Sequence, residues 1–250
     1  MIVEVKDLHV KYGKFEAVKG VSFSLGKGEI LGIVGESGSG KSTIAKTLMN
    51  LERPSSGEIL FAGKSPENGH RAVKMQMIFQ DAVGSLNPRM TVGQTLREVL
   101  RHFGRGASSA ERIPHLLSLV GLSEAVLEQY PRELSGGQCQ RVSIARALAC
   151  EPDVLVADEP VSALDVSVQA RVLNILRDLR RDLGLSIILI AHDLAVVKNV
   201  CDYICVMEKG RFVDCGNAAD VFERPQSEYT RRLLEVVPDV EKSLAERYIR

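Results

Sequence analysis

Residues 35–43, with the sequence GESGSGKST, have the types and spacing of a phosphate-binding loop. An apolar run at residues 30–34 precedes them, and a helix-compatible segment at residues 44–48 follows. Such a turn points several backbone N–H groups and the positive end of a helix dipole at one place, which suits the β- and γ-phosphates of a nucleotide. Lys41 adds a positive charge, and Ser42 offers a hydroxyl to Mg²⁺. This context favours a phosphate site over a glycine-rich turn that binds nothing.

Polar residues stand at the carboxyl ends of three other apolar runs: Gln80, the pair Asp158-Glu159, and His192. Ligands of open parallel sheets bind beyond the carboxyl ends of the strands, so we expect these side chains to meet at the phosphate loop. Asp158 would hold Mg²⁺, directly or through water, and Glu159 would orient or deprotonate an attacking water. Gln80 would sense the metal and the water, and His192 would contact the γ-phosphate. Any one of them alone would indicate a cap or a satisfied polar group.

A second glycine motif, LSGGQ at residues 134–138, directly precedes a helical apolar pattern at residues 142–149. A serine and two glycines at a helix start leave backbone N–H groups and a hydroxyl free to meet phosphate. The alternative is a plain serine N-cap followed by flexible glycines. The motif by itself does not separate these two interpretations.

The remaining patterns are typical of an α/β fold. A strand–helix–strand pattern over residues 154–190 indicates a parallel sheet, and residues 2–25 alternate like an antiparallel β layer. From residue 84 to about residue 130 the apolar period becomes helical, which predicts an inserted helical subdomain. A hairpin is expected over residues 203–213, and one or two surface helices are expected beyond Pro225.

Composition excludes several classes of protein. Lys plus Arg equals Asp plus Glu at 32 each, and no block of like charge stands out, so nothing favours nucleic acid as a partner. The longest apolar runs are far shorter than the roughly 20 residues of a membrane helix. The first residues alternate like a strand instead of a signal peptide, which predicts cytosolic exposure. Five cysteines without a CxxC pair fit a reducing compartment.

Taken together, the motifs resemble those of the ATP-binding cassette ATPases of ABC transporters. The resemblance rests on GESGSGKST, LSGGQ, VLVADEP at residues 154–160, SALD at residues 162–165 and AHD at residues 191–193, and it covers roughly residues 2–234. It implies a P-loop NTPase (RecA-like) core with a parallel sheet over residues 1–83 and 150–224. The helical subdomain would span about residues 84–149, within an ATPase domain at 1–235, and the tail would span residues 225–250.

The resemblance also implies roles for individual residues. Tyr12 would stack on adenine, and Asp165 would belong to the D-loop. Asp158 would be the Walker B aspartate, Glu159 the catalytic base and His192 the switch histidine. The implied catalytic residues are Lys41, Gln80, Glu159 and His192. The residues implied around Mg²⁺ are Ser42, Gln80 and Asp158. The residues implied around ATP are Tyr12, Val18, Gly35, Glu36, Ser37, Gly38, Ser39, Gly40, Lys41, Ser42, Thr43, Ser135, Gly136, Gly137, Gln138 and Asp165.

The family further implies that two cassettes pair head to tail, so that residues 135–138 of one cap the ATP on Lys41 of the other. A second helix N-terminus there would exclude water and stabilise charge, which makes closure dependent on ATP. Hydrolysis would release the clamp and so drive a partner. We therefore expect the ATP-hydrolysing subunit of an importer, peripheral on the cytoplasmic face of the cell membrane. Its expected partners are a second ATPase subunit, identical or homologous, two membrane permease subunits and, indirectly, a substrate-binding protein.

Two segments indicate the branch of the family. Residues 79–92 look like the ATPases of dipeptide, oligopeptide and nickel importers, and PQSEYTRRLL at residues 225–234 is similar to their C-terminal Tyr-Thr motif. Ser227-Glu228 stands where a His-Pro pair is common, and a cysteine-rich extension is absent, so no cysteine-bound cluster is expected. Peptide and nickel or metallophore substrates both stay open. The resemblance places the docking of membrane subunits on residues 84–130, and the alternative is that this region only presents LSGGQ.

Other functions compete with this prediction. A soluble ABC ATPase acting on nucleic acid or the translation machinery usually has paired cassettes or long insertions, which this compact, charge-balanced chain lacks. A non-catalytic regulatory module is disfavoured by the intact Lys41, Asp158, Glu159 and His192. A nucleotide kinase would leave LSGGQ unexplained.

Three cysteines call for an interpretation. Cys139 follows LSGGQ directly; it is either a neutral thiol or a reactive one, because a helix N-terminus can lower the pKa of a thiol. Cys201 and Cys205 have no companion ligand at a useful spacing, so we predict that they pack in the core instead of binding metal.

Overall fold

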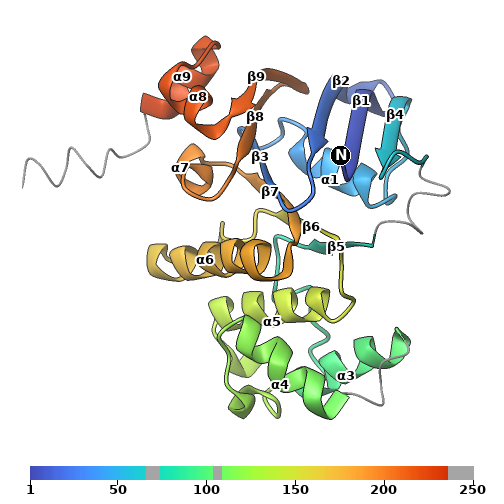
Figure 1. The fold of residues 1–250 in the computed structure, drawn as a ribbon, viewed down its shortest axis with the longest axis vertical. Coiled ribbons are helices and arrows are strands. Elements are labelled where there is room, and N and C mark those ends of the chain that lie inside the picture. The colour runs from blue at the N-terminus through green and yellow to red at the C-terminus, as the bar shows by residue number, and fades with distance from the viewer. Residues whose placement is uncertain (66–73, 104–108, 236–250) are drawn as a thin grey trace, which may run out of the picture.

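The computed structural model describes residues 1–65, 74–103 and 109–235. Residues 236–250 of the predicted tail lie outside this part of the chain. The described residues form an α/β fold in which two sheets lie at one end and a group of helices at the other (Figure 1). This arrangement agrees with the predicted antiparallel layer, parallel sheet and helical insertion.

The first layer is a three-stranded antiparallel sheet with the strand order β2-β1-β4. Its strands are β1 (Val3–Tyr12), β2 (Phe15–Leu25) and β4 (Ser56–Phe61). A tight turn at Gly13, with a φ of 60°, joins β1 to β2, and this left-handed conformation favours glycine. The turn pairs Tyr12 with Phe15 and brings both aromatic side chains to the same end of the hairpin.

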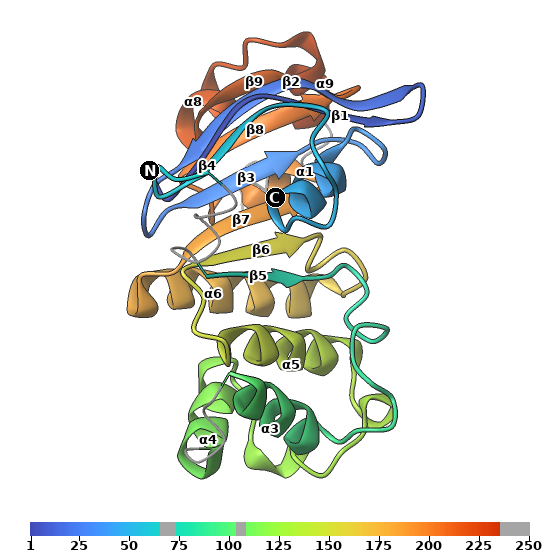
Figure 2. The ribbon, with the colours of Figure 1, turned by 90° about the vertical axis from the view of Figure 1, so that its right-hand side faces the viewer.

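The second sheet has six strands in the order β5-β6-β7-β3-β8-β9 (Figure 2). They are β3 (Ile30–Val34), β5 (Met75–Ile78), β6 (Val154–Asp158), β7 (Ser186–Ala191), β8 (Tyr203–Glu208) and β9 (Arg211–Asn217). The first five in this order pair in parallel, and β9 turns back antiparallel to β8, which confirms the predicted terminal hairpin. The carboxyl ends of β3, β5, β6 and β7 therefore share one edge of the sheet.

The strands β3, β6 and β7 are buried at every residue, so both faces of the sheet are covered there, and these strands are almost entirely apolar. In β6, Val154 and Val156 pack with the antiparallel sheet and α1 (Lys41–Leu48). Leu155 and Ala157 point the other way, toward a core that includes α6 (Val166–Leu183). Helix α1 thus lies between the two sheets, with its N-terminus at the carboxyl edge of β3.

The remaining helices divide into two groups at opposite ends of the molecule (Figures 1 and 2). The helical subdomain contains α3 (Val92–His102), α4 (Ser109–Leu119), α5 (Gly136–Leu148) and the short 3-10 helices η2 (Glu124–Val126) and η3 (Pro131–Glu133). The other group contains α7 (Leu194–Val197), α8 (Ala218–Glu223) and α9 (Glu228–Glu235). Helix α9 packs beside β9, so the end of the described chain returns to the sheet.

Within the described ranges, no helix is both long enough and apolar enough to cross a membrane.

Candidate functional site

The phosphate loop follows β3, whose five residues are all buried, and leads into α1. Gly38 and Gly40 have φ angles of 80° and 113°, a conformation that side chains other than glycine rarely adopt. At Gly35 a Cβ atom would lie 2.1 Å from the carbonyl oxygen of Met207, so the loop can approach β8 only without a side chain there. These backbone demands explain the glycines of the motif.

Lys41 is 3% exposed and extends back over the loop. Its ammonium donates hydrogen bonds to the carbonyl oxygens of Gly35, at 2.7 Å, and Glu36, at 2.9 Å. Its Nζ atom also lies 3.8 Å from Oε1 of Glu159. Burial lowers the pKa of Lys41, and the carboxylates of Glu159 and Asp158 oppose that shift. A desolvated ammonium in this position is suited to binding an anion.

Ser42 and Asp158 bring oxygen ligands together beside Lys41. The Ser42 hydroxyl donates a hydrogen bond to Oδ1 of Asp158 at 3.0 Å. Burial raises the pKa of Asp158, and the bond from Ser42 opposes that shift. A hydroxyl and a carboxylate fit Mg²⁺, which takes one or two protein oxygens and completes its shell with phosphate and water.

Glu159 is held in a strained backbone conformation at the end of β6. Its φ is 45°, which is uncommon for a residue other than glycine, and its N–H donates to the carbonyl oxygen of Ile190 at 3.0 Å. Its carboxylate accepts a hydrogen bond from Nε2 of Gln80 at 2.9 Å. Glu159, the predicted base, and Gln80, which was predicted to sense the metal and the water, are therefore in direct contact.

A cavity of about 290 Å³ joins these groups to the turn of the β1–β2 hairpin. Its lining residues are Tyr12, Phe15, Ala17, Ser37, Gly38, Gly40, Lys41, Ser42, Thr43, Gln80 and Glu159. The cavity thus has a polar, cationic part over the phosphate loop and an aromatic part at the hairpin. These two parts match the phosphates and the base of a nucleotide.

The loop also contains a polar group without a partner. The Ser39 hydroxyl is buried, and it has no hydrogen-bond partner among the described residues. A buried polar atom of this kind usually finds a partner, because leaving it unpaired costs about 1–3 kcal/mol. A bound phosphate oxygen fits that need.

Three other predicted residues, Val18, His192 and Asp165, do not line the cavity. Val18 does not line the cavity; its side chain is fully buried, and Ala17 is exposed to the cavity instead, because neighbouring residues of a strand point to opposite faces. His192 directly follows β7, at the same sheet edge as Glu159, and its side chain is exposed. Asp165 caps α6 by accepting a hydrogen bond from the Val168 N–H at 3.0 Å, which lowers its pKa.

Sequence reasoning missed Phe15 and Ala17. Phe15 is 64% exposed beside Tyr12, and an exposed aromatic residue directly after a hairpin turn is a signal that could have identified it. The side chain of Ala17 has no functional group that could have identified it from the sequence. Its position depends on the way β2 passes Gly40, where the Ala17 carbonyl oxygen would lie 2.5 Å from a Cβ atom.

The second glycine motif stands apart from this cavity. Ser135 caps α5 in a capping box: its hydroxyl accepts from the Gln138 N–H at 3.3 Å, and its own N–H donates to the Gln138 side chain at 2.8 Å. Ser135 and Gly136 are exposed. Gly137 is buried, and a Cβ there would lie 2.3 Å from Cγ1 of Val168 in α6. None of residues 135–138 lines the cavity at Lys41.

Of the two alternatives for Cys139, the structure favours the neutral thiol. Its side chain is fully buried, and its Sγ donates to the Pro131 carbonyl oxygen at 3.4 Å. Burial raises the pKa of the thiol, so desolvation outweighs the proximity of the helix N-terminus. Cys201 and Cys205 are buried in the two cores, as predicted.

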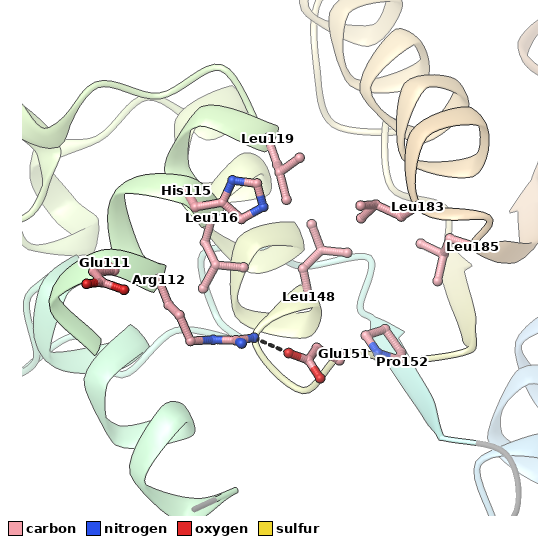
Figure 3. Close-up of a pocket in the computed structure, with 10 residues that line it drawn as sticks. All are labelled: Glu111, Arg112, His115, Leu116, Leu119, Leu148, Glu151, Pro152, Leu183 and Leu185. Atoms are coloured by element: carbon pink, nitrogen blue, oxygen red, sulfur yellow. Dashed lines mark ion pairs between the residues drawn. The ribbon is translucent and has the colours of Figure 1, made fainter. Parts of the chain in front are cut away.

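A different cavity, of about 530 Å³, lies between α4, the end of α5 and the segment that joins α6 to β7 (Figure 3). Most of its lining is apolar, and an ion pair between Arg112 and Glu151 lies at one side. Leu116 and Leu148 of the helical subdomain face Leu185, which directly precedes β7. This cavity has neither the glycine-rich backbone nor the lysine of the phosphate loop, and we do not assign the nucleotide to it.

Comparison with known proteins agrees with the geometry. The profile of the family described as ABC transporter matches residues 18–162. The oligopeptide transport ATP-binding protein OppF of Lactococcus lactis is 46% identical, over 96% of this chain and 81% of its own. Its namesake in Escherichia coli is 44% identical, over 97% and 80%. A putative peptide import ATP-binding protein of Brucella ovis is 45% identical, over 93% and 76%.

Solved structures with the same fold include two ABC cassettes. The cassette MJ0796, solved as a dimer in a post-hydrolysis state bound to ADP and Pi, superposes with a TM-score of 0.75 and 28% identity, over 86% of this chain and 98% of that one. CbiO1 from Clostridium perfringens, part of an ABC transporter complex, superposes with a TM-score of 0.79 and 29% identity over 98% of both chains.

Proposed function

Since the chain belongs to the ABC transporter family and is an ATPase, we propose that it drives the import of oligopeptides through separate membrane subunits. The observation that carries the proposal is a built nucleotide site in a chain that is 44–46% identical, over most of its length, to three ATP-binding proteins named for peptide transport or import. These relatives support peptides over the nickel alternative. ATP hydrolysis by this chain would take place on the cytoplasmic face of the cell membrane.

In this proposal the phosphate loop and Lys41 bind the β- and γ-phosphates, and Tyr12 and Phe15 stack on the adenine. Ser42 and Asp158 would hold Mg²⁺, which neutralises charge on the phosphates when bound. Glu159 accepts the proton of the attacking water. Its strained backbone and its bond to Gln80 keep the carboxylate near the loop before the nucleotide arrives.

The exposed Ser135 end would serve the nucleotide of a second ATPase subunit. The support is that residues 135–138 stand outside the cavity of their own chain, and that a neighbour with the same fold was solved as a dimer. Two such chains, identical or homologous, would each complete the other's site. Hydrolysis would remove the γ-phosphate that both chains contact and would open the pair.

A groove of about 310 Å³ between the core and the helical subdomain would receive the membrane subunits. Its lining residues are Met49, Leu51, Gln76, Met77, Phe79, Val99, Phe103, Arg146, Ala147 and Cys150. Leu51, Phe79 and Phe103 are exposed large apolar side chains, which favours a partner over solvent. Phe79 directly precedes Gln80, so a change in the groove could reach Glu159 through one side-chain hydrogen bond.

Reconstituted transport tests the function. The tagged chain is purified from native membranes together with its membrane subunits and placed in liposomes with its substrate-binding protein. We expect ATP-dependent uptake of labelled oligopeptides that stops when Glu159→Gln replaces the native chain. Uptake of Ni²⁺ but not of peptides would contradict the peptide proposal, and the absence of any membrane subunit from the purified complex would contradict import itself.

A further inference from the structure

A tyrosine from the end of the described chain reaches the phosphate loop. Tyr229 lies in the first turn of α9, and its side chain is 7% exposed. Its hydroxyl oxygen accepts a hydrogen bond from the backbone N–H of Glu36 at 3.1 Å, across 193 residues of sequence. The family profile ends at residue 162, so it does not include this tyrosine.

The contact completes the restraint of the backbone of one residue, Glu36. The carbonyl oxygen of Glu36 accepts hydrogen bonds from Lys41 Nζ, at 2.9 Å, and from the Ser39 N–H, at 3.2 Å. Those two donors belong to the loop and its helix. The N–H of Glu36 is held from outside the loop, by Tyr229 alone among the described residues. The second residue of GESGSGKST is therefore fixed on both sides of its backbone.

Helix α9 is itself anchored to the sheet, so Tyr229 is not on a free end. The buried carboxylate of Asp214 in β9 accepts hydrogen bonds from the N–H groups of Gln226, at 2.8 Å, and Ser227, at 3.2 Å. The Ser227 hydroxyl accepts from the Tyr229 N–H at 3.1 Å. Burial raises the pKa of Tyr229, which keeps its hydroxyl neutral near pH 7. The link from the sheet to the loop is thus made of short, partly buried contacts.

We propose that Tyr229 is a positioning residue for the phosphate loop and that α9 thereby sets the affinity for nucleotide. A loop rich in glycine has much conformational freedom to lose, and a shape that is populated only in part weakens binding by that fraction. The Tyr229 hydroxyl restricts the turn before the nucleotide arrives. The inference requires nucleotide binding but not peptide transport, so it stands or falls separately from the importer proposal.

The test compares two hydroxyl deletions on neighbouring residues of α9. Tyr229→Phe keeps the ring and removes only the bond to Glu36. Thr230→Val is the matched control, because Thr230 is fully buried and its hydroxyl has no hydrogen-bond partner among the described residues. Binding of a fluorescent ADP analogue and of ATP is measured on the full chain, with thermal denaturation in the absence and presence of ADP.

We expect Tyr229→Phe to raise the Kd for ADP and ATP about threefold to tenfold, the size of one neutral hydrogen bond. Its Tm without nucleotide should fall by at most about 2–4 °C, since one hydrogen bond is lost, and its Tm increase with ADP should be smaller than that of the native chain. When the rate of ATP hydrolysis is measured across a range of ATP concentrations, the variant should have a higher KM than the native chain and the same kcat. Thr230→Val should match the native chain in Kd, KM and kcat, and its Tm should be equal or higher, because it removes a buried hydroxyl that has no partner among the described residues.

Three results would overturn the proposal. One is an unchanged Kd in Tyr229→Phe, and another is a lower Tm with an unchanged Kd, which would limit the tyrosine to holding α9. The third is an equal loss of affinity in Thr230→Val. If the native chain itself fails to bind ADP, the nucleotide function fails first, and that result is distinguishable because it precedes any comparison of variants.

Discussion

The chain has two glycine-rich helix starts, and they differ in how much of a site surrounds each one. At the phosphate loop, α1 meets Gln80, Asp158 and Glu159 from other strands, and a cavity extends from it. At the Ser135 end, the cap of α5 is made by its own first turn and faces outward. The same local chemistry therefore lies beside a cavity with charged side chains in one place and at an exposed helix start in the other.

The difference teaches that a helix N-terminus is a site only through its neighbours. The phosphate loop lies beside charged side chains from strands that are distant in sequence. Gly137, in contrast, packs against Val168. In the function proposed above, the exposed Ser135 end would be completed by a second chain. Variants at the phosphate loop and at the Ser135 end should separate these two helix starts, and the largest effect is expected first.

The largest effect is expected at the base. Glu159→Gln should lower the rate of ATP hydrolysis by about 100- to 10,000-fold, because a positioned base contributes that much. Nucleotide binding should remain, and ATP should hold two chains together, because the clamp no longer opens. Phosphate release and size-exclusion chromatography with ATP measure both properties.

The exposed Glu124→Gln on η2 serves as the matched control and should match the native chain. A Glu159→Gln chain that hydrolyses ATP normally, or that stays monomeric in ATP, would refute the role of the base and the completion of the site by a second chain.

The next effect separates the two helix starts directly. Lys41→Met should weaken ATP binding to the single chain about 10- to 100-fold, since a hydrogen bond from a charged group is lost. Ser135→Ala should leave that Kd within about twofold and lower only the turnover of the paired chains. Titration of ATP at a protein concentration that keeps the chain monomeric measures the first property. Equal losses of affinity in both variants would abolish the distinction.

A smaller effect concerns pH and stability at the phosphate loop. The folded pKa of Asp158 is raised by burial, so in the window between its ordinary value and the raised one the folded chain binds more protons than the unfolded chain. The contribution of Asp158 to the free energy of unfolding therefore increases as the pH falls through that window and decreases as the pH rises.

Asp158→Asn should raise the Tm at pH 7 by about 2–4 °C, the shift that roughly 1 kcal/mol produces in a chain of this size. The gain should shrink as the pH is lowered toward 4. Calorimetry of both chains across this range measures it, and a constant difference would show that the carboxylate is not destabilised by burial.

The smallest effect is at the Ser135 end. Maleimide should label Cys215, which is exposed, and leave Cys139 unmodified with or without ATP, because desolvation raises the pKa of that thiol. Peptide mapping identifies the labelled residue. Cys215→Ser is the control and should bring native-state labelling close to zero. Labelling of Cys139 that ATP prevents would restore the reactive alternative and would make this helix start less rigid than its packing indicates.

Much of the fold and the site was determined by local sequence. The glycines of the phosphate loop, the capping box at Ser135 and the polar residues after apolar strands follow from backbone sterics and hydrogen bonding within a few residues. The parallel strands predicted from these patterns then brought Gln80 to Glu159 and Ser42 to Asp158, because the carboxyl ends of parallel strands share one edge.

Tertiary structure alone decided the rest. Cys139 is buried by other elements, which raises the pKa of its thiol, and Ala17, not Val18, lines the cavity because of how β2 passes the loop. The hydrogen bond between Tyr229 and Glu36 joins residues far apart in sequence, and no local sequence pattern predicts it. Burial and long-range contacts depend on which surfaces meet after packing. A single sequence gives the chemistry of each residue, but it does not show which surfaces pack against each other.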